Sequence, residues 1–442
     1  STERITAELV SMTASATPGS TLILAVRQDI EPDWHTYWRN PGDSGGATTL
    51  DWALPEGWEA GDIVWPLPER QPLPRPDLRM IQRPVGPVAV FGASNFPLAF
   101  STAGGDTAAA LAAGCPVVVK GHSAHPGTGE IVAQAISAAI KTCGVHPGVF
   151  SLVQGGTRET GQALVTHPLI RAVGFTGSLA GGRALFDLCV ARAEPIPFFG
   201  ELGSVNPMFL MGNAVKARGA EIAKGWAGSL TMGAGQFCTN PGIAVIVDGP
   251  DADAFANAAT EALEPVGAQT MLTDGIAGAY RSGRDRVAAS AGVQELLTST
   301  CDLRNATPYL YRVSGKDWLT NHALGEEVFG PLGLIVTVAD FDEMLAIARS
   351  LQGQLTCTIH MDAADTEEGK ALMPVLERKA GRLLANGFPT GVEVCDAMVH
   401  GGPYPASTNF GATSVGTLSI RRFLRPVCYQ NMPQYLLPED LR

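Results

Sequence analysis

The chain has 442 residues, of which 45% are hydrophobic and 17% charged, with 51 glycines and a formal net charge of −12. This length exceeds one simple core and predicts two or three domains of a turn-rich α/β enzyme. The negative charge and the lack of a Lys/Arg run argue against nucleic acid as a partner. Neither a signal peptide nor an apolar run of the roughly 20 residues that span a bilayer is found, so we expect a cytoplasmic protein without a membrane partner.

The first 70 residues differ in composition from the rest of the chain. Short strands separated by Pro/Gly turns are predicted at Ile23–Asp29, Trp34–Trp38 and Thr48–Trp52. We therefore expect a β-rich segment over residues 1–70. Residues 71–85, which continue a proline-rich string, are predicted to form a linker or an oligomerisation strand.

From Gly86 onwards, apolar strands alternate with helices. The strands are predicted at Val88–Phe91, Pro116–Val119, Val149–Val153 and Ala172–Phe175, and the helices at Ala103–Ala113, Gly129–Lys141, Glu159–Val165 and Leu179–Ala191. A second such region contains the strands Ala244–Val247 and Leu334–Val338 and the helices Ala252–Leu263 and Asp342–Leu351. This alternation is typical of parallel sheets that helices cover on both faces and that bind ligands beyond the carboxyl ends of their strands. The fold prediction is α/β, with domains at 86–203 and 204–415 and an arm at 416–442.

Cysteine and histidine spacing argues against a metal centre. No CxxC pair occurs among the cysteines, which are Cys115, Cys143, Cys189, Cys238, Cys301, Cys357, Cys395 and Cys428. The eight histidines show no HxxxH spacing. The sequence thus predicts no metal site, and the scattered cysteines are typical of a reducing compartment.

The segment from Gly233 to Thr239 is the strongest candidate for chemistry. Its glycines leave room for a substrate to approach Cys238, and a cysteine thiolate attacks carbonyl carbons well. The alternative is a buried, inert cysteine, and this segment alone does not decide between the two.

Two further polar residues follow apolar segments. Glu201 comes after Pro195–Phe199, where partial desolvation would raise its pKa toward that of a general base; the alternative is a solvated loop carboxylate. Asn95 follows the strand that ends at Phe91 and has an amide able to donate to an oxyanion; the alternative is a turn-forming asparagine.

A glycine-rich segment from Phe175 to Gly182 opens a helix directly after a strand. Free backbone N–H groups at a helix N-terminus bind pyrophosphate. The segment is not a GxGxxG motif, so a loop that binds nothing is the alternative.

Taken together, these four segments resemble the aldehyde dehydrogenase superfamily in order and spacing over residues 72–442. The likeness is greatest to the members that act on 2-oxoglutarate semialdehyde (2,5-dioxopentanoate), through FGASNFPLAFSTAGGDTAAALAAGCPVVVKGHSAHPGT, HGGPYPAST and RPVCYQN. The resemblance implies a Rossmann-type cofactor domain at 86–203, a catalytic domain at 204–415 and a homo-oligomer formed through the C-terminal arm. It also implies oxidation of a small aldehyde to a carboxylate.

The resemblance assigns roles to individual residues. Cys238 matches the nucleophile, Asn95 and the Cys238 backbone amide match the oxyanion donors, and Glu201 matches the base that activates water for thioester hydrolysis. Lys120 matches the residue that holds the adenosine ribose, and Glu327 matches the carboxylate that binds the nicotinamide ribose. The implied cofactor site comprises Ala93, Ser94, Lys120, Ser123, Gly177, Ser178, Gly182, Glu327 and Phe329.

Cofactor preference depends on Ser123. Members that prefer NAD often have a glutamate three residues after the lysine, and its carboxylate would repel the 2′-phosphate of NADP. Because this chain has serine there, we expect NADP or NAD to be accepted, with NADP slightly favoured.

Residues 1–70 resemble the start of the N-terminal domain of DsbD-type thiol–disulfide interchange proteins, through ITAELVSMTASATPG, EPDWHTYWRNPGDSGG and LDWALPEGW. That domain is an immunoglobulin-like sandwich, of which this chain would hold a part. The cysteine nearest the N-terminus is Cys115, so we expect no thiol chemistry from this segment. Three functions stay open: an NAD(P)-dependent semialdehyde dehydrogenase, a non-catalytic hybrid or binding protein, and a cofactor-independent thiol esterase.

Overall fold

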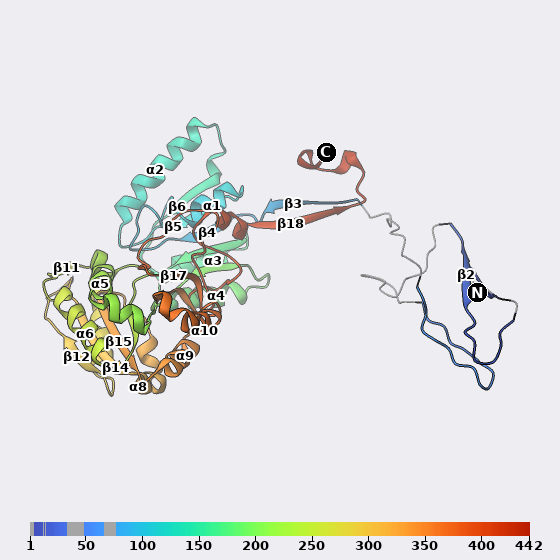
Figure 1. Cartoon of the computed structure of the whole chain (residues 1–442). Helices are drawn as coiled ribbons and strands as arrows, with labels where there is room; N and C mark the ends of the chain where they lie inside the picture. The colour runs from blue at the N-terminus through green and yellow to red at the C-terminus, as the bar shows by residue number, and fades with distance from the viewer. Residues whose placement is uncertain (1–3, 12, 14, 33–47, 66–76) are drawn as a thin grey trace. The chain divides into compact units, whose positions relative to one another are not determined.

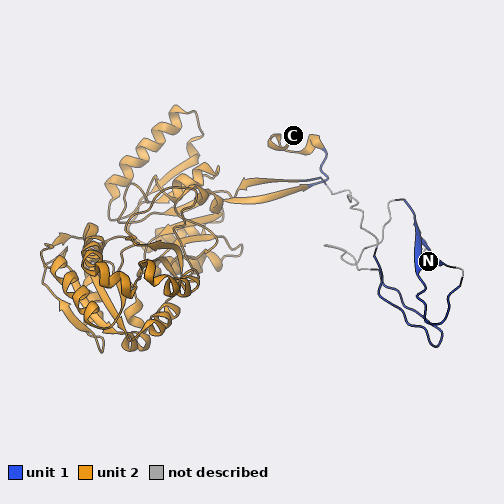
Figure 2. Ribbon diagram, viewed as in Figure 1, with its two compact units in different colours: residues 1–78, 430–433 blue, residues 79–429, 434–442 orange. Residues whose placement is uncertain are grey.

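A computed structural model of the chain describes residues 4–11, 13, 15–32, 48–65 and 77–442 (Figure 1). It divides into two compact units, one of residues 1–78 with 430–433 and one of residues 79–429 with 434–442 (Figure 2). No helix in the described part of the chain is long and apolar enough to cross a bilayer.

The smaller unit contains an antiparallel pair of strands, β1 (Ile5–Ser11) and β2 (Leu24–Ile30). The strand predicted at Ile23–Asp29 is thus confirmed to within one residue. The strand predicted at Thr48–Trp52 is wrong, since these residues form no strand. A turn follows shortly, in which the N–H of Trp58 donates to the carbonyl oxygen of Pro55, and proline disfavours regular strand pairing. The strand predicted at Trp34–Trp38 lies outside the described residues.

A five-stranded parallel sheet begins the larger unit. Its strands are β4 (Val88–Phe91), β5 (Val117–Lys120), β6 (Phe150–Val153), β7 (Ala172–Thr176) and β8 (Phe198–Glu201), in the order β6-β5-β4-β7-β8. Four helices connect them: α1 (Asp106–Ala112), α2 (Pro126–Thr142), α3 (Arg158–Thr166) and α4 (Leu179–Val190). Alanines of α1 and α2 pack in the core on one face, while Val165 of α3 and Cys189 of α4 pack on the other. Helices therefore cover both faces, as predicted.

The strand order creates a switch point beside β4. From β4 the chain runs outward through β5 and β6, and it then returns to pair β7 along the other edge of β4. Parallel sheets wound in this way bind nucleotides beyond the carboxyl ends of the two strands at the reversal. The loops that leave this edge carry Ala93 after β4 and Gly177 after β7, so the fold directs both toward one place.

A seven-stranded sheet forms the rest of the larger unit. Its strands are β9 (Met208–Leu210), β10 (Ile243–Val247), β12 (Gln294–Leu297), β14 (Tyr309–Ser314), β15 (Leu332–Val338), β16 (Gln354–His360) and β17 (Ala380–Ala385), in the order β12-β14-β15-β10-β9-β16-β17. All neighbours are parallel except β12 and β14. The α-helices are α5 (Gly212–Thr231), α6 (Pro250–Leu263), α7 (Asp274–Ala288), α8 (Gly315–Thr320), α9 (Phe341–Ser350) and α10 (Thr366–Leu376). Trp226 of α5 stacks on Phe255 of α6 in the core of one face.

Two small sheets complete the fold. β11 (Gln269–Thr270) pairs with β13 (Asn305–Ala306), and β3 (Leu78–Pro84) pairs with β18 (Leu424–Gln430). The short 3₁₀ turns are η1 (Pro147–Val149), η2 (Met232–Gly235), η3 (His322–Gly325), η4 (Ala363–Asp365), η5 (Thr417–Phe423), η6 (Gln434–Leu436) and η7 (Glu439–Leu441). Most predicted helix ends lie within a few residues of the observed ones. The helix α2 begins at Pro126, before its predicted start at Gly129, because proline is well suited to the first helical turn.

Candidate active site

The loop that carries Cys238 follows α5 and η2 and has a special backbone. Gly233, Ala234 and Gly235 have φ angles of 58°, 58° and 67°. A Cβ atom on Gly235 would lie 2.3 Å from the carbonyl carbon of Gly330, so only glycine fits where these two backbones meet. The Cys238 side chain lies half-buried beyond this turn.

A buried amide fixes the position of the loop. Nδ2 of Asn206 donates to the carbonyl oxygens of Cys238, at 2.9 Å, and Asn240, at 3.0 Å. Its Oδ1 accepts from the hydroxyls of Ser204 and Thr356. Asn206 is fully buried, and all these contacts satisfy its polar atoms. The segment after Glu201 and the loop of Cys238 are therefore held against each other.

Glu201 is the last residue of β8, and its side chain is buried. Its Oε1 lies 3.0 Å from Nε2 of His400, and its Oε2 accepts a 2.6 Å hydrogen bond from the Ser414 hydroxyl. Burial raises the pKa of Glu201, but the His400 imidazole and the hydrogen bonds of His400, Ser414 and Cys238 outweigh it, so the net pKa is lowered. The predicted rise in the pKa of Glu201 is therefore wrong. Desolvation is present, but hydrogen-bond partners that sequence reasoning did not identify hold the carboxylate ionised.

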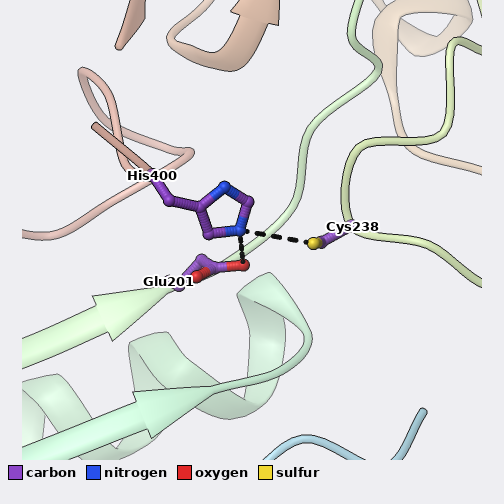
Figure 3. Close-up of side chains that lie close together, drawn as sticks. All are labelled: Glu201, Cys238 and His400. Atoms are coloured by element: carbon purple, nitrogen blue, oxygen red, sulfur yellow. Dashed lines mark hydrogen bonds and ion pairs between the residues drawn. The ribbon is translucent and has the colours of Figure 1, made fainter. Parts of the chain in front are cut away.

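His400 joins the nucleophile to the carboxylate. Its Nε2 lies 3.4 Å from Sγ of Cys238 and 3.0 Å from Glu201 (Figure 3). The backbone N–H of His400 donates to the Thr413 hydroxyl, and its carbonyl oxygen accepts from the backbone N–H of Ser414. Sequence reasoning missed this residue. The string HGGPYPAST contains it, but nothing along the chain places that string beside Cys238.

The protons around this nitrogen can be assigned. A neutral imidazole nitrogen offers either one hydrogen or one lone pair. Since Glu201 is ionised, the Nε2–H of His400 donates to the carboxylate. Burial, the charge of Glu201 and a hydrogen bond to it, and the charge of Glu327 raise the pKa of Cys238 well above its ordinary value. The resting nucleophile is thus a neutral thiol next to a carboxylate that can take its proton.

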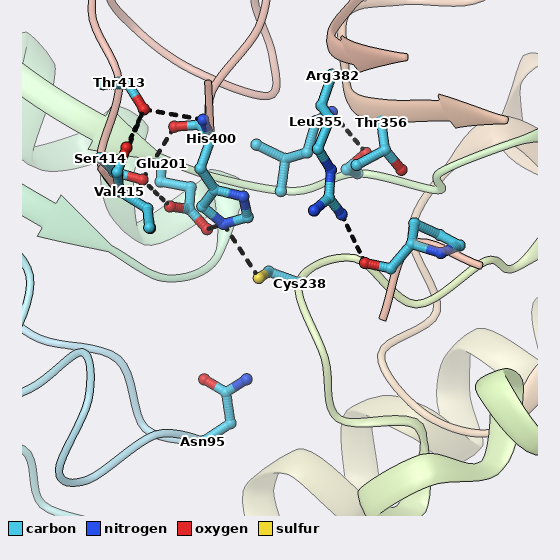
Figure 4. Close-up of polar contacts among 12 residues, drawn as sticks. Asn95, Glu201, Cys238, Leu355, Thr356, Arg382, His400, Thr413, Ser414 and Val415 are labelled. Carbon is cyan, nitrogen blue, oxygen red and sulfur yellow. Dashed lines mark hydrogen bonds and ion pairs between the residues drawn. The ribbon is translucent and has the colours of Figure 1, made fainter. Parts of the chain in front are cut away.

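Asn95 lies in the loop after β4, and its Nδ2 donates to the carbonyl oxygen of Gln236 at 2.7 Å. Gln236 precedes Cys238 by two residues, so the amide is held beside the nucleophile loop (Figure 4). An amide nitrogen carries two hydrogens, and one of them remains for a ligand.

The residues expected at the adenosine and pyrophosphate end follow the strands of the five-stranded sheet. Lys120 is the last residue of β5 and half-buried, and burial lowers its pKa. Ser123 lies exposed in the next loop. Ser178 caps α4, with its hydroxyl accepting from the N–H of Gly181, and a Cβ on Gly182 would lie 2.1 Å from a side-chain carbon of Leu202.

The loop after β4 contributes Ala93 and Ser94. The N–H of Ala93 donates to the carbonyl oxygen of Phe100 at 2.7 Å, and its own carbonyl oxygen lies 3.2 Å from Nε2 of His125. Both backbone groups of Ala93 are therefore engaged within the protein. Ser94 is half-buried next to it.

Glu327 and Phe329 line a pocket that also has Gly235 and Phe237 of the nucleophile loop in its wall. Burial raises the pKa of Glu327 to about 8; a backbone hydrogen bond from Ser204 acts against this, and the charge of Glu201 adds to it. The residues expected at the nicotinamide ribose are thus brought next to Cys238, although about 90 residues separate them in the chain.

A cationic side chain is the remaining charged group of the site. Arg382 of β17 donates from its two terminal nitrogens to the carbonyl oxygens of Gly391, at 2.7 Å, and Pro389, at 2.6 Å. Burial lowers the pKa of Arg382, and the charge of Cys238 raises it. Within the described residues it forms no ion pair, and its buried Nε has no hydrogen-bond partner.

Comparisons with known proteins identify the family of the chain. Residues 67–403 match the aldehyde dehydrogenase family, and residues 4–80 match the N-terminal domain of the thiol:disulfide interchange protein DsbD. The chain belongs to the aldehyde dehydrogenase family, whose members are NAD(P)-dependent enzymes that oxidise aldehydes. Both resemblances predicted from the sequence are confirmed.

Two relatives are especially similar. The alpha-ketoglutaric semialdehyde dehydrogenase 2 of Azospirillum brasilense is 55% identical over 380 residues, which cover 85% of this chain and 72% of that protein. The alpha-ketoglutaric semialdehyde dehydrogenase of Acinetobacter baylyi is 50% identical over 379 residues, with the same coverage of 85% and 72%. Among solved structures, the glyceraldehyde-3-phosphate dehydrogenase GapN of Methanocaldococcus jannaschii, complexed with NADP, has a TM-score of 0.68 at 21% identity, over 82% of this chain and 76% of that one. This likeness confirms the predicted fold.

Proposed function

We propose that the chain oxidises 2-oxoglutarate semialdehyde to the dicarboxylate, with Cys238 as nucleophile and NADP or NAD as hydride acceptor. The observation that carries this proposal is the convergence of Cys238, His400 and Glu201 in a buried cluster. The relatives from A. brasilense and A. baylyi, which are named for the same aldehyde, support the substrate.

The first step is attack of sulfur on the aldehyde carbon. Glu201 takes the thiol proton of Cys238, and the sulfur–carbon bond forms a thiohemiacetal. The oxyanion accepts hydrogen bonds from the backbone N–H of Cys238 and from the side chain of Asn95. Loss of one such donor typically slows an enzyme by about 10²–10³-fold. Because the resting thiol of Cys238 is neutral, the base Glu201 must lie close enough to remove its proton.

Several features fit a dinucleotide at the carboxyl edge of the five-stranded sheet. The N-terminus of α4 offers free N–H groups beside Ser178, the switch point lies between β4 and β7, and Lys120 ends the neighbouring strand. Lys120 and Ser123 would hold the adenosine ribose, Gly177, Ser178 and Gly182 the pyrophosphate, and Glu327 and Phe329 the nicotinamide end, with Ala93 and Ser94 along the wall. A nicotinamide held by these residues would supply the hydride acceptor that converts the thiohemiacetal into the thioester.

We infer a preference for NADP from Ser123. The residue is exposed and neutral next to Lys120, so a 2′-phosphate meets a cation and no carboxylate there. Half-buried His122 in the same loop adds no repulsion: burial, His125 and Lys120 lower its pKa to about 4, which leaves it neutral at pH 7.

The second step is hydrolysis of the thioester on Cys238. Glu201 removes a proton from the attacking water, and its two oxygens are oriented by His400 and Ser414. Before this, the proton taken from the thiol must leave Glu201. A second cavity, lined by Glu201, Ser414, Thr176 and Asp106, lies behind the carboxylate and offers polar groups along that route.

Recognition of the substrate carboxylate falls to Arg382 in this proposal. The half-buried guanidinium of Arg382 forms no ion pair among the described residues, and the carboxylate of a ligand would supply the missing negative charge. Burial lowers the pKa of Arg382, and the charge of an ionised Cys238 acts in the opposite direction, which supports a position of Arg382 near the reacting carbon. An aldehyde with a carboxylate at its other end would present its carbonyl carbon to Cys238 and its carboxylate to Arg382.

The β3–β18 pair is our candidate for an oligomerisation arm. Leu78 and Met80 of β3 are 57% and 62% exposed, so this two-stranded sheet has apolar side chains available to a second copy of the chain. We therefore propose a homo-oligomer in which residues 416–442 take part.

The decisive experiment measures reduced nicotinamide formed from 2-oxoglutarate semialdehyde, with NADP or NAD, in the intact chain and in Cys238→Ala. Activity that vanishes in the variant supports the proposal. Folded wild-type protein that gives no reduced nicotinamide with either cofactor would overturn it. Hydrolysis of a simple ester without cofactor, measured in parallel, distinguishes a thiol esterase from a dehydrogenase.

A further inference from the structure

Three metal-ligand side chains of different chemistry converge at one point of the larger unit. Sγ of Cys238, Nε2 of His400 and a carboxylate oxygen of Glu201 all lie within 4.8 Å of one another. The two shorter separations are 3.4 Å, from sulfur to nitrogen, and 3.0 Å, from nitrogen to oxygen (Figure 3). We propose that these three residues also form a binding site for a thiophilic divalent ion such as Zn²⁺, which reversibly blocks the nucleophile.

The separations suit the geometry of zinc. Zn²⁺ binds thiolate sulfur at about 2.3 Å and imidazole nitrogen or carboxylate oxygen at about 2.0–2.2 Å, in a tetrahedral arrangement. An ion at these bond lengths can bridge the sulfur–nitrogen and nitrogen–oxygen pairs, which lie 3.4 and 3.0 Å apart, and small side-chain rotations would adjust the carboxylate of Glu201 toward tetrahedral geometry. One thiolate, one imidazole and one carboxylate satisfy three positions and leave the fourth for water.

In the contacts that these three side chains make with one another, little positive charge faces the carboxylate of Glu201 and the sulfur of Cys238. The one hydrogen on Nε2 of His400 faces both the carboxylate of Glu201 and the sulfur of Cys238. An ion at the same point would bind all three atoms. Binding replaces the thiol proton, which leaves to solvent, and moves the imidazole proton to Nδ1. The thiolate and the carboxylate then carry two negative charges against the two positive charges of the ion, so the cluster, which carries the single negative charge of Glu201 before binding, becomes neutral.

An ion can reach this cluster, because Cys238 is half-buried whereas Glu201 and His400 lie behind it. The spacing of cysteines and histidines along the sequence predicted no metal site. Such spacing detects only ligands that lie close together in the chain, whereas these three ligands come from distant segments. The ion would act as an inhibitor, because the atom that it occupies is the sulfur that must attack the aldehyde. The metal site itself rests on side-chain geometry and does not depend on the proposed substrate, whereas its inhibitory effect rests on the proposed role of Cys238 as nucleophile.

The test titrates the reduced, metal-free chain with Zn²⁺ against a chromophoric chelator. We expect one ion bound per chain and affinity at least about 10–100-fold weaker in Cys238→Ser and in His400→Phe, since even the loss of an outer partner of a ligand costs that much. Co²⁺ should give a thiolate-to-metal absorption band that Cys238→Ser abolishes. The matched control is Cys143→Ser with His146→Gln, which removes an exposed cysteine and an exposed histidine of another surface segment and should leave binding unchanged.

A second measurement needs no variant and so does not depend on how the variants fold. Stoichiometric Zn²⁺ should protect Cys238 from iodoacetamide, as mapped by mass spectrometry, and removal of the ion by a chelator should restore alkylation. Unprotected Cys238 in the presence of bound Zn²⁺ would overturn the proposal. So would Zn²⁺ affinity that is equal in the wild type and Cys238→Ser, or that is lost in the Cys143/His146 control.

Discussion

The side chains of Cys238 and His400 are 162 residues apart in the chain, yet Sγ and Nε2 lie 3.4 Å apart. The same nitrogen lies 3.0 Å from Glu201. The histidine thus contacts both the proposed nucleophile and the proposed base through a single atom. It differs from a relay in which the two ring nitrogens face different partners, because Nδ1 of His400 is buried without a hydrogen-bond partner among the described residues.

Replacement of His400 by phenylalanine should therefore act through Glu201. Without the imidazole, burial of the carboxylate is less compensated, and the pKa of Glu201 rises. The acid limb of the kcat/KM profile should move to higher pH, because the base must be ionised, and the rate at neutral pH should fall by about 10–100-fold. Ser414→Ala should shift the limb in the same direction. A lower rate with the acid limb unmoved would rule out this coupling.

Substitution of Glu201 by glutamine should leave a trapped intermediate. Glutamine keeps the shape of the side chain but accepts no proton, so thioester hydrolysis should slow by about 10²–10⁴-fold. A single turnover followed by mass spectrometry should show an acyl group on Cys238. If the variant is slow but carries no adduct, loss of Glu201 slows a step before the thioester at least as much as it slows hydrolysis, and the expected accumulation is contradicted.

Arg382→Met should distinguish anionic from neutral aldehydes. A hydrogen bond to a charged group contributes about 1.5–3 kcal/mol, so kcat/KM for 2-oxoglutarate semialdehyde should fall by about 10–100-fold through a higher KM. Propanal, which has no carboxylate, is the matched control. Arg382→Lys should recover part of the loss by retaining a cation. An equal loss on both aldehydes would indicate that Arg382 only holds the segment that contains Pro389 and Gly391.

Ser123→Glu should change the cofactor preference. A carboxylate near Lys120 repels a 2′-phosphate and can accept a hydrogen bond from a ribose hydroxyl. The ratio of kcat/KM for NADP to that for NAD should fall by about 10-fold, whereas the neutral Ser123→Gln should change it little. A ratio that responds equally to both substitutions would assign the selectivity elsewhere.

The raised pKa of Glu327 leads to a prediction about how the stability of the folded chain depends on pH. Its folded pKa of about 8 lies above its ordinary value of 4.5, so the folded chain keeps this proton over a pH range in which the unfolded chain has lost it. The contribution of this group to the free energy of unfolding is therefore complete below pH 4.5 and decreases until about pH 8. Glu327→Gln should raise Tm in alkaline buffer and have less effect in mildly acidic buffer, without cofactor. A Tm gain that is independent of pH would contradict the assignment.

The sequence predicted those features that depend only on residues within one strand or helix. The strands Val88–Phe91 and Ala172–Phe175 and the helix after Ser178 follow from local hydrophobicity and capping, and the structure has them almost as predicted. His400 and the direction of the Glu201 pKa shift were not predictable in this way. Both depend on a segment that follows the last strand of the seven-stranded sheet and folds back across β8, where Ser407 bridges Glu201.

The close approach of Gly235 to Gly330 has a consequence for anyone who wishes to redesign this enzyme. The turn before the reactive sulfur and the loop that follows Glu327 are in backbone contact, with no side chain between them. A change that shifts one loop is passed directly to the other, so binding of the nicotinamide end and reactivity of the sulfur cannot be tuned as independent traits. Directed evolution of either property should therefore favour paired substitutions, one in each loop, over single ones.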